Sequence, residues 1–319
     1  CATHMPSCFH TILGERIAAG MINTVSGRDH SLNVIEVTEA GHPVPDSKGV
    51  EGTEKILGLA DSAGERDLVI GLISGGGSSL LVAPAAGLSL RDLKEVNRLL
   101  LQSGAPIEKI NVVRKCLSRV KGGRLAGRIY PATVLCLVIS DVIGDRLETI
   151  ASGPLFPDLS TDKDALEILE DYGLHGMVPA SVIGRLEAGR AGEIDETPNF
   201  GSRLFAGIHH LIVADNTMAL ESCSDRAGEL GFRPVILSAE IGDEAGKAAR
   251  RMAAAAKSVR HARRPGKEPV CLLAGGEITV TVRGEGDGGR NQEFVLAAAR
   301  EIAGEEGITV LSAGSDGID

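Results

Sequence analysis

The chain has 319 residues, of which 43% are hydrophobic and only 3% aromatic, and its formal net charge is −10. The length fits about two domains, and the acidic charge excludes a protein that binds nucleic acid or a membrane surface through its overall charge. An anionic ligand therefore needs a local basic pocket. No apolar run reaches the ~20 residues of a membrane span, and six cysteines without CxxC spacing suit a cytoplasmic protein with reduced thiols.

Short runs rich in β-branched residues alternate with helical patterns along the chain. The predicted strands span residues 69–73, 133–139, 210–214, 234–237, 270–274, 278–283 and 308–312. The predicted helices span residues 49–62, 89–103, 106–120, 163–171, 216–230, 243–259 and 291–303. This alternation predicts an α/β fold with a mostly parallel sheet covered by helices on both faces.

A change in pattern near residue 260 predicts a domain boundary. Residues 260–269, with the sequence RHARRPGKEP, combine Arg, Lys, Pro and Gly as a linker does. Residues 270–284 then predict two strands around a Gly-Gly turn, which would form an antiparallel hairpin. We therefore expect a second domain with a mixed sheet.

Small, polar or acidic residues follow four of the predicted strands. In an open α/β sheet, ligands bind beyond the carboxyl ends of the strands. The residues at these ends are Ser74–Ser79, Ser140–Asp145, Asp215–Asn216 and Ala313–Gly317. Their convergence predicts a ligand site more strongly than any one loop does.

The first of these loops, SGGGSS, is a candidate phosphate-binding loop. Glycines let backbone N–H groups approach an anion, serine hydroxyls add donors, and a helix starting near Ser78 would add the positive end of its dipole. The alternative is a tight strand-to-helix turn without a ligand. The loop is neither a Walker A motif nor GxGxxG. The candidate cofactor-binding residues are Gly75, Gly76, Gly77, Ser78 and Ser79.

A basic segment, residues 111–128, contains six cations and no acid. The residues spaced to share one helical face are Asn111, Arg114, Ser118 and Lys121. Such a face could meet a carboxylate or phosphates, and the following glycine pair permits close backbone approach. The alternative is a solvated basic helix. The candidates are Arg114 and Lys115 for substrate binding, and Lys121, Gly122 and Gly123 for cofactor binding.

A glycine-rich loop leads into a predicted helix that has Arg290, Asn291 and Gln292 near its start. A helix N-terminus favours acids over cations, so an arginine there suggests an anion beside it. The alternative is a flexible loop with an exposed arginine.

Asp141, Asp145 and Asp316 are candidate ligands for Mg²⁺, which takes one or two carboxylates and keeps several waters. For each aspartate alone, a helix cap or turn is the commoner explanation. His42 could act as an acid or base, or anchor a proline-rich turn. Together these features suit phosphoryl transfer, in an α/β enzyme that handles phosphates and a small acid.

Six stretches of the chain resemble glycerate 2-kinases of the MOFRL type, in order and over nearly its whole length. They are AGHPVPDSKGVEGTEKIL, LISGGGSSLL, INVVRKCLSRVKGGRLA, ISDVIGDRLETIASGPLFPDLST, GGRNQEFVLAAAR and VLSAGSDGID. The resemblance implies that ATP, with Mg²⁺, phosphorylates D-glycerate to 2-phosphoglycerate. Relatives have also been called hydroxypyruvate reductases, so an NADH- or NADPH-dependent reductase is the alternative, although no dinucleotide fingerprint is present.

The resemblance also implies the architecture. It suggests a Rossmann-like three-layer N-terminal domain with a mostly parallel sheet, residues 1–259, and a smaller MOFRL-type α/β domain with a mixed sheet, residues 266–319. The active site would lie in the cleft between them. By position, Arg290 matches a catalytic arginine, and Asn291 beside it is a further candidate for substrate binding. D-glycerate is the expected small-molecule substrate, and a homodimer is a possible oligomeric state.

Both ends of the chain look truncated when compared with the family. A family lysine in a GAGKA turn would lie just upstream of Cys1, and the segment after Asp319 is missing. We therefore expect residues 1–319 alone to have greatly reduced kinase activity, or to be a non-catalytic fragment. Cys116 replaces a histidine common in the family, and Leu155 replaces a threonine.

Overall fold

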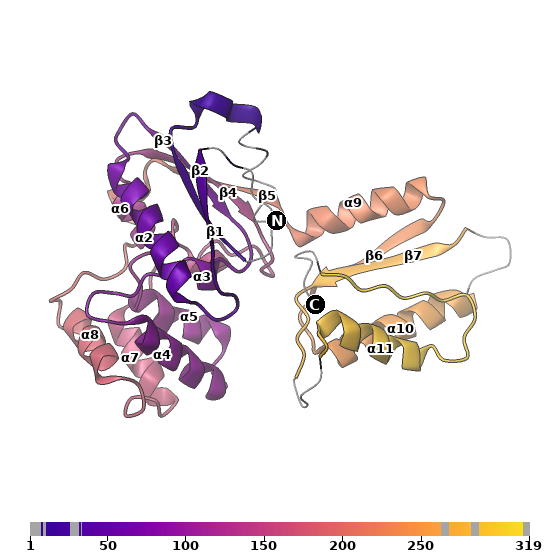
Figure 1. Cartoon of the computed structure of the whole chain (residues 1–319). Coiled ribbons are helices and arrows are strands. Elements are labelled where there is room, and N and C mark those ends of the chain that lie inside the picture. The colour runs from indigo at the N-terminus through magenta and orange to yellow at the C-terminus, as the bar shows by residue number, and fades with distance from the viewer. Residues whose placement is uncertain are drawn as a thin grey trace. The chain divides into compact units, whose positions relative to one another are not determined.

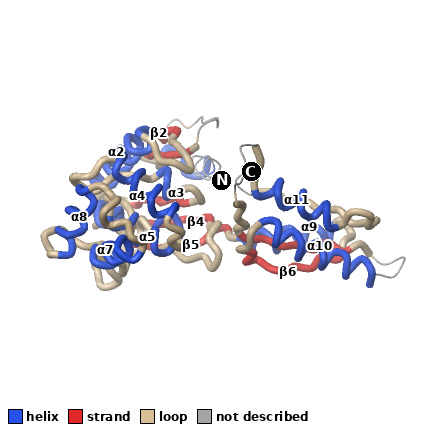
Figure 2. Tube along the Cα trace, turned by 90° about the horizontal axis from the view of Figure 1, so that it is seen from below, coloured by secondary structure: helices blue, strands red, loops and turns tan. Residues whose placement is uncertain are grey.

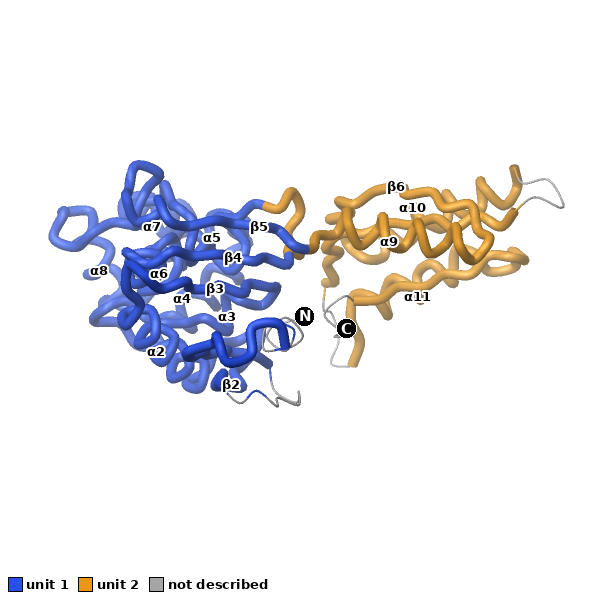
Figure 3. Tube along the Cα trace, turned by 90° about the horizontal axis from the view of Figure 1, so that it is seen from above, with its two compact units in different colours: residues 1–139, 146–213 blue, residues 140–145, 214–319 orange. Residues whose placement is uncertain are grey.

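Parallel strands and helices alternate along the chain, as the computed structural model shows (Figure 1). The structure describes residues 8, 11–25, 32, 34–262, 268–281 and 287–314. Two compact units are present, residues 1–139 with 146–213 (unit 1) and residues 140–145 with 214–319 (unit 2) (Figure 3). Among the helices that the structure describes, none has the length and apolar character needed to cross a bilayer. The predicted α/β class is confirmed.

Unit 1 contains two sheets, and the strand pairs with a described register are parallel. One pairs β1 (Gly20–Thr24) with β2 (Ile35–Glu39). The other has the order β3-β4-β5, formed by Leu68–Ile73, Thr133–Ile139 and Ile208–Ala214. The pair β3 and β4 runs parallel from Leu68 opposite Thr133. The strands predicted at 69–73, 133–139 and 210–214 are therefore confirmed, whereas β1 and β2 were not predicted.

Seven α-helices of unit 1 lie within the described residues. They are α2 (Ser47–Ser62), α3 (Gly77–Leu80), α4 (Leu90–Gln102), α5 (Ile107–Cys116), α6 (Arg124–Ile129), α7 (Asp162–Asp171) and α8 (Ala180–Arg190). Short polar side chains fix several starts, because they accept the free N–H groups of the first turn. Asp46 caps α2, and reciprocal capping boxes begin α4 and α7. Three 3₁₀ turns, η1 (Gly14–Arg16), η2 (Ile150–Ser152) and η3 (Arg203–Phe205), complete the unit.

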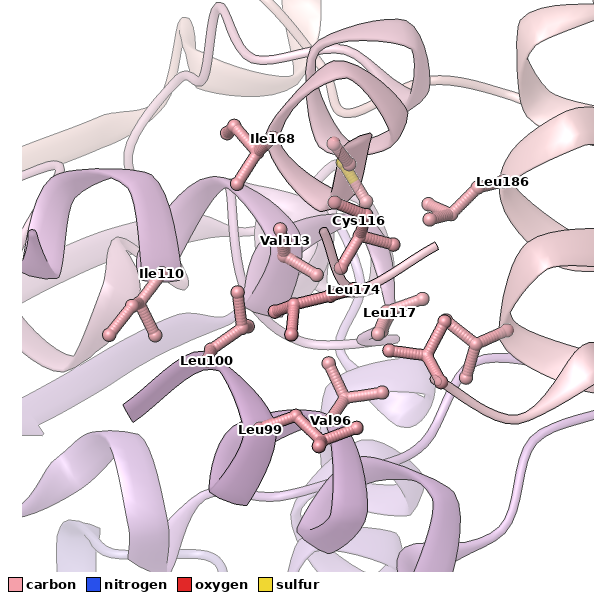
Figure 4. Close-up of a cluster of buried hydrophobic side chains, with 14 of the residues drawn as sticks. Val96, Leu99, Leu100, Ile110, Val113, Cys116, Leu117, Ile168, Leu174 and Leu186 are labelled. Carbon is pink, nitrogen blue, oxygen red and sulfur yellow. The ribbon is translucent and has the colours of Figure 1, made fainter. Parts of the chain in front are cut away.

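Helices α4, α5, α7 and α8 enclose a hydrophobic core of their own (Figure 4). Leu100, Val113, Leu169 and Leu186 are fully buried there. Cys116 belongs to the same core, with its Sγ 3.4 Å from the carbonyl oxygen of Thr161. The residue that departs from the family pattern thus acts as a small buried apolar side chain.

We expect Leu186→Ala to lower the free energy of unfolding by about 3 kcal/mol, because the truncation leaves a cavity in this core. Urea denaturation measures the loss. Leu101→Ala is the matched control, since Leu101 of α4 is 61% exposed, and it should change stability by less than about 0.5 kcal/mol. Equal losses for the two variants would contradict the packing described.

Unit 2 pairs β6 (Arg233–Ile241) with β7 (Val270–Gly276) in parallel. Its helices are α9 (Asn216–Glu229), α10 (Ala245–Ala262) and α11 (Arg290–Glu301) (Figure 2). Alanines of α10 let α11 approach closely, so that Ala248 and Ala249 pack with Phe294 and Ala298. The predicted helices at 216–230, 243–259 and 291–303 are confirmed.

The antiparallel hairpin predicted for residues 270–284 is wrong. The glycine pair lies inside β7, and a Cβ at Gly276 would stand 2.2 Å from the carbonyl oxygen of Ile241. The glycines therefore permit close backbone approach to β6 instead of forming a turn. Thr279 makes only an isolated parallel bridge to Glu244, and the described sheet of this unit is parallel, not mixed.

Two further local predictions fail. Residues 278–281 and 308–312, both described, form no strand, and residues 282–283 lie outside the described part. The helix predicted over 106–120 ends at Cys116. Because α9, β6 and α10 pack with β7 and α11, the compact units divide near residue 214 instead of between 259 and 266. As divisions between sequence families, 1–259 and 266–319 stay a prediction.

Candidate active site

The glycine loop follows β3 directly and leads into α3. Gly76 has a positive φ of 80°, which favours glycine. Within the described part of the chain, the N–H groups of Gly75 and Gly76 donate to no protein acceptor. Gly77 and Ser78 open α3, and the first N–H groups of a helix have no acceptor within it. The loop thus presents N–H groups that can donate hydrogen bonds to an anion.

Close neighbours explain why no side chain is present at two loop positions. A Cβ on Gly76 would lie 3.1 Å from the imidazole of His42, and one on Gly77 would lie 2.6 Å from the Cβ of Ala151. The motif that contains His42 therefore lies against the glycine loop. Both stretches were singled out from the sequence, and the structure brings them together.

Lys121 reaches this loop from the basic segment. Its ammonium donates to the carbonyl oxygens of Ser78, at 2.6 Å, and Leu81, at 3.3 Å. Burial, and then repulsion from Arg114, lower the pKa of Lys121 to about 7. The predicted nucleotide-binding lysine thus contacts the backbone of the predicted phosphate-binding loop.

The two glycines after Lys121 use their N–H groups within the protein. Gly122 donates to Ser152 at 3.0 Å and Gly123 donates to Gly153 at 2.7 Å, each time to the carbonyl oxygen. Ala151 and Ser152 have positive φ values of 51° and 63°, a strained conformation that often occurs at functional sites. These contacts fix a turn, and nucleotide binding by Gly122 and Gly123 stays a prediction.

Ser152 also connects this turn to the glycine loop. Its buried hydroxyl lies 2.7 Å from that of Ser78. The hydroxyl of Ser79 donates to the carbonyl oxygen of Gly76 at 3.0 Å. One of the two hydroxyls donates to the other, and either can be the donor.

The predicted helical face of the basic segment is only partly present, because α5 ends at Cys116 before Ser118 and Lys121. Lys115 is buried in an ion pair with Asp158 at 2.8 Å. Arg114 donates to the side-chain oxygens of Asn97 and Asn111, and burial lowers the pKa of its guanidinium.

For part of the basic segment, the cations are solvated and pair with acids at the surface, as the alternative interpretation of a solvated basic helix expects. Arg119 and Arg128 pair with acids of α2, Glu54 and Asp61. Among the described ion pairs, none involves Arg114 or Lys121. Arg124 likewise has no described ion pair and donates to the carbonyl oxygen of Asp195.

In unit 2, Arg290 forms an ion pair with Glu277. The anion described beside this arginine is thus a carboxylate of the protein itself, and a ligand anion there stays a prediction. Asn291 accepts a hydrogen bond from the hydroxyl of Ser312 at 2.6 Å.

Two of the three metal-ligand candidates, Asp141 and Asp145, lie in a short turn. Asp141 is exposed, and Asp145 has a positive φ of 52° and donates its N–H to the carbonyl oxygen of Val142. Asp316 lies outside the described residues. The part of the chain that the structure describes holds no cluster of three His, Cys, Asp or Glu side chains suited to a metal ion.

One residue that positions the site was not found from the sequence. The side-chain amide of Asn23 donates to the carbonyl oxygens of Leu80, at 2.8 Å, and Gly49, at 3.2 Å. It thereby joins β1, α2 and α3 beside the glycine loop. No local signal marks it, because its partners are distant in the sequence.

Two family models match the chain. One, described as a domain of unknown function (DUF4147), matches residues 1–187, and the MOFRL family matches residues 270–319. The chain is 42% identical to a D-glycerate 2-kinase of Thermotoga maritima over 100% of this chain and 73% of that protein. It is also 42% identical to a glycerate 2-kinase of Pyrococcus horikoshii, over 94% of this chain and 67% of that protein.

A protein of Agrobacterium vitis with the provisional name hydroxypyruvate reductase is 41% identical, over 99% of this chain and 80% of its own length. The crystal structure of the glycerate kinase of Thermotoga maritima has a TM-score of 0.83 and 41% identity, covering 96% of this chain and 71% of that chain. Sequence and structure agree on one assignment. The chain belongs to the glycerate 2-kinase family of the MOFRL type.

Proposed function

We propose that the protein transfers the γ-phosphoryl group of ATP to the C2 hydroxyl of D-glycerate, giving ADP, 2-phosphoglycerate and a proton. The observation that carries this proposal is the 42% identity to a D-glycerate 2-kinase over the entire chain. Phosphoryl transfer depends mainly on positioning the phosphates and neutralising their charge. The glycine loop, and Lys121 bound to its backbone, suit those tasks.

The loop Gly75–Ser79 is our proposed binding site for the nucleotide phosphates. Its support is the set of backbone donors without protein acceptors and the positive φ of Gly76. Backbone N–H groups in such a turn attract phosphate oxygens. Lys121, Gly122 and Gly123 belong to the same proposed site.

For D-glycerate, we propose that Arg114, Lys115 and Asn291 bind the substrate. A guanidinium suits a carboxylate, because it can form two parallel hydrogen bonds. Arg114 is a better candidate than Lys115 for this role, since its described partners are neutral amides, whereas Lys115 already pairs with Asp158. Arg290 is the proposed catalytic residue, which stabilises charge on the transferring phosphoryl group.

Mg²⁺ is part of the proposal, with Asp141, Asp145 and Asp316 as candidate ligands. The support is that Asp141 and Asp145 lie in one turn, since Mg²⁺ is usually held by one or two carboxylates together with phosphates and water. When bound, Mg²⁺ neutralises charge on the phosphates. A cytoplasmic location and a homodimer are further parts of the proposal.

The experiment combines the full-length protein with D-glycerate, ATP and Mg²⁺ and measures ADP release. Phosphorus NMR of the product distinguishes 2-phosphoglycerate from 3-phosphoglycerate. A parallel assay follows oxidation of NADH and NADPH with hydroxypyruvate. Release of ADP together with 2-phosphoglycerate is expected. ADP at background level, or oxidation of NADH or NADPH that depends on hydroxypyruvate, would contradict the proposal.

A further inference from the structure

Lys121 keeps its ammonium group inside unit 1 without an acidic partner among the described residues. The residue is 3% exposed, and its nitrogen bonds to two backbone carbonyls. The charged group that acts on it is another cation, Arg114. Burying a charge without a counter-charge costs several kcal/mol, so packing alone is a weak reason for a lysine here.

Lys115 in the same segment shows the contrast. It is similarly buried, but its ammonium pairs with Asp158 at 2.8 Å. The carboxylate of Asp158 compensates the positive charge of Lys115, so the two residues form a structural ion pair. Lys121 instead donates to the backbone carbonyls of Ser78, in the glycine loop, and of Leu81, just after α3.

The two carbonyls that Lys121 binds belong to the turn formed by α3. Ser78 lies within α3, and Leu81 follows its last residue. A peptide group is planar, so fixing the carbonyl of Ser78 also fixes the N–H of Ser79. That N–H donates to the carbonyl oxygen of Gly76 at 3.1 Å. The constraint therefore extends from Lys121 to the peptide group between Gly76 and Gly77.

We propose that Lys121 is a positioning residue, which holds the carbonyls of Ser78 and Leu81 so that the peptide group between Gly76 and Gly77, and with it the N–H of Gly77, keeps its place in the phosphate-binding loop. This inference rests on the proposed function of the loop. It specifies how Lys121 contributes to that nucleotide site: through the backbone of the loop, by its hydrogen bonds to the two carbonyls.

The test compares Lys121→Met with Lys163→Met in the full chain. Methionine nearly matches lysine in length and removes only the charge and the donors, and Lys163 is an exposed lysine of α7. Lys121→Gln, measured alongside, covers the case in which the methionine variant does not fold. Hydrogen–deuterium exchange of peptides covering residues 74–82 reports the loop without any need for activity. Steady-state kinetics give KM separately for ATP and D-glycerate.

For Lys121→Met or Lys121→Gln, we expect exchange in residues 74–82 to quicken at least about tenfold, while α4 peptides keep their wild-type rates. The KM for ATP should rise at least about tenfold, and the KM for D-glycerate should change less than about twofold. Lys163→Met should match the wild type in both measurements. Unchanged loop exchange overturns the inference, including when the KM for ATP rises, since that combination indicates direct contact. A wild-type protein without kinase activity would refute the proposed function, while the exchange data would still report on the loop.

Discussion

Arg290→Ala is expected to lower kcat by about 10²-fold or more, on the scale of losing one donor that stabilises a transition state. The KM values should change much less, because the proposed interaction strengthens as charge develops on the transferring phosphoryl group. Steady-state kinetics with saturating ATP and D-glycerate measure the effect.

A second substitution at Arg290, whose guanidinium pairs with Glu277, tests whether the guanidinium itself is needed. Arg290→Lys keeps the charge but loses the planar guanidinium, so it should recover only part of the lost rate. Arg300→Ala, an exposed position near the end of the same helix, is the matched control and should retain wild-type kcat. If Arg290→Ala turns over at the control rate, Arg290 has no catalytic role.

Gly76→Val is expected to raise the KM for ATP at least about tenfold, equivalent to ~1.4 kcal/mol of binding. A side chain at this position meets the imidazole of His42 at 3.1 Å from its Cβ and requires a positive φ of 80°. Because of both constraints, we expect the loop backbone, with its N–H donors, to shift when valine is introduced.

Gly87→Val separates backbone strain from the effect on the loop. Gly87 has nearly the same φ, 81°, but nothing lies within 4 Å of the position of its Cβ. Both variants should lose a similar amount of stability in thermal denaturation, and only Gly76→Val should weaken ATP binding. Equal KM values for ATP in the two variants would remove the case for a phosphate-binding loop.

The sequence predicted those parts of the fold whose signals are local. The apolar runs of β3 and β4 and the capped helices α4 and α7 were found from short stretches alone. The glycine loop was placed correctly because it follows β3 directly. Two strands, β1 and β2, were missed because they are short and partly polar, so that their pairing with each other stabilises them more than propensity does.

Tertiary contacts decided the other failures. Helix α8 contains Gly184 and Gly189, which disfavour a helix locally. The structure explains Gly189, where a Cβ would lie 1.7 Å from the carboxylate of Asp162. The Gly275–Gly276 pair has the composition of a turn, but it serves close approach to β6. A local pattern cannot distinguish these two uses of glycine.

The candidate site also has features that the sequence reveals and features that only the fold reveals. The residue types suited to phosphate binding were visible in the sequence, but their partners were not. That Lys121 binds the carbonyls of Ser78 and Leu81, about 40 residues earlier in the chain, follows only from the fold. The same holds for the pair formed by Ser78 and Ser152, and for Asn23, which the sequence did not single out.

The central claim is that the amides of the glycine loop bind the phosphates of ATP. A crystal structure of the full chain with a non-hydrolysable ATP analogue and Mg²⁺ measures this directly. We predict phosphate oxygens within about 3.2 Å of the backbone nitrogens of Gly75 and Gly76. Phosphates bound away from residues 74–79, with those two N–H groups facing only solvent, would contradict the account.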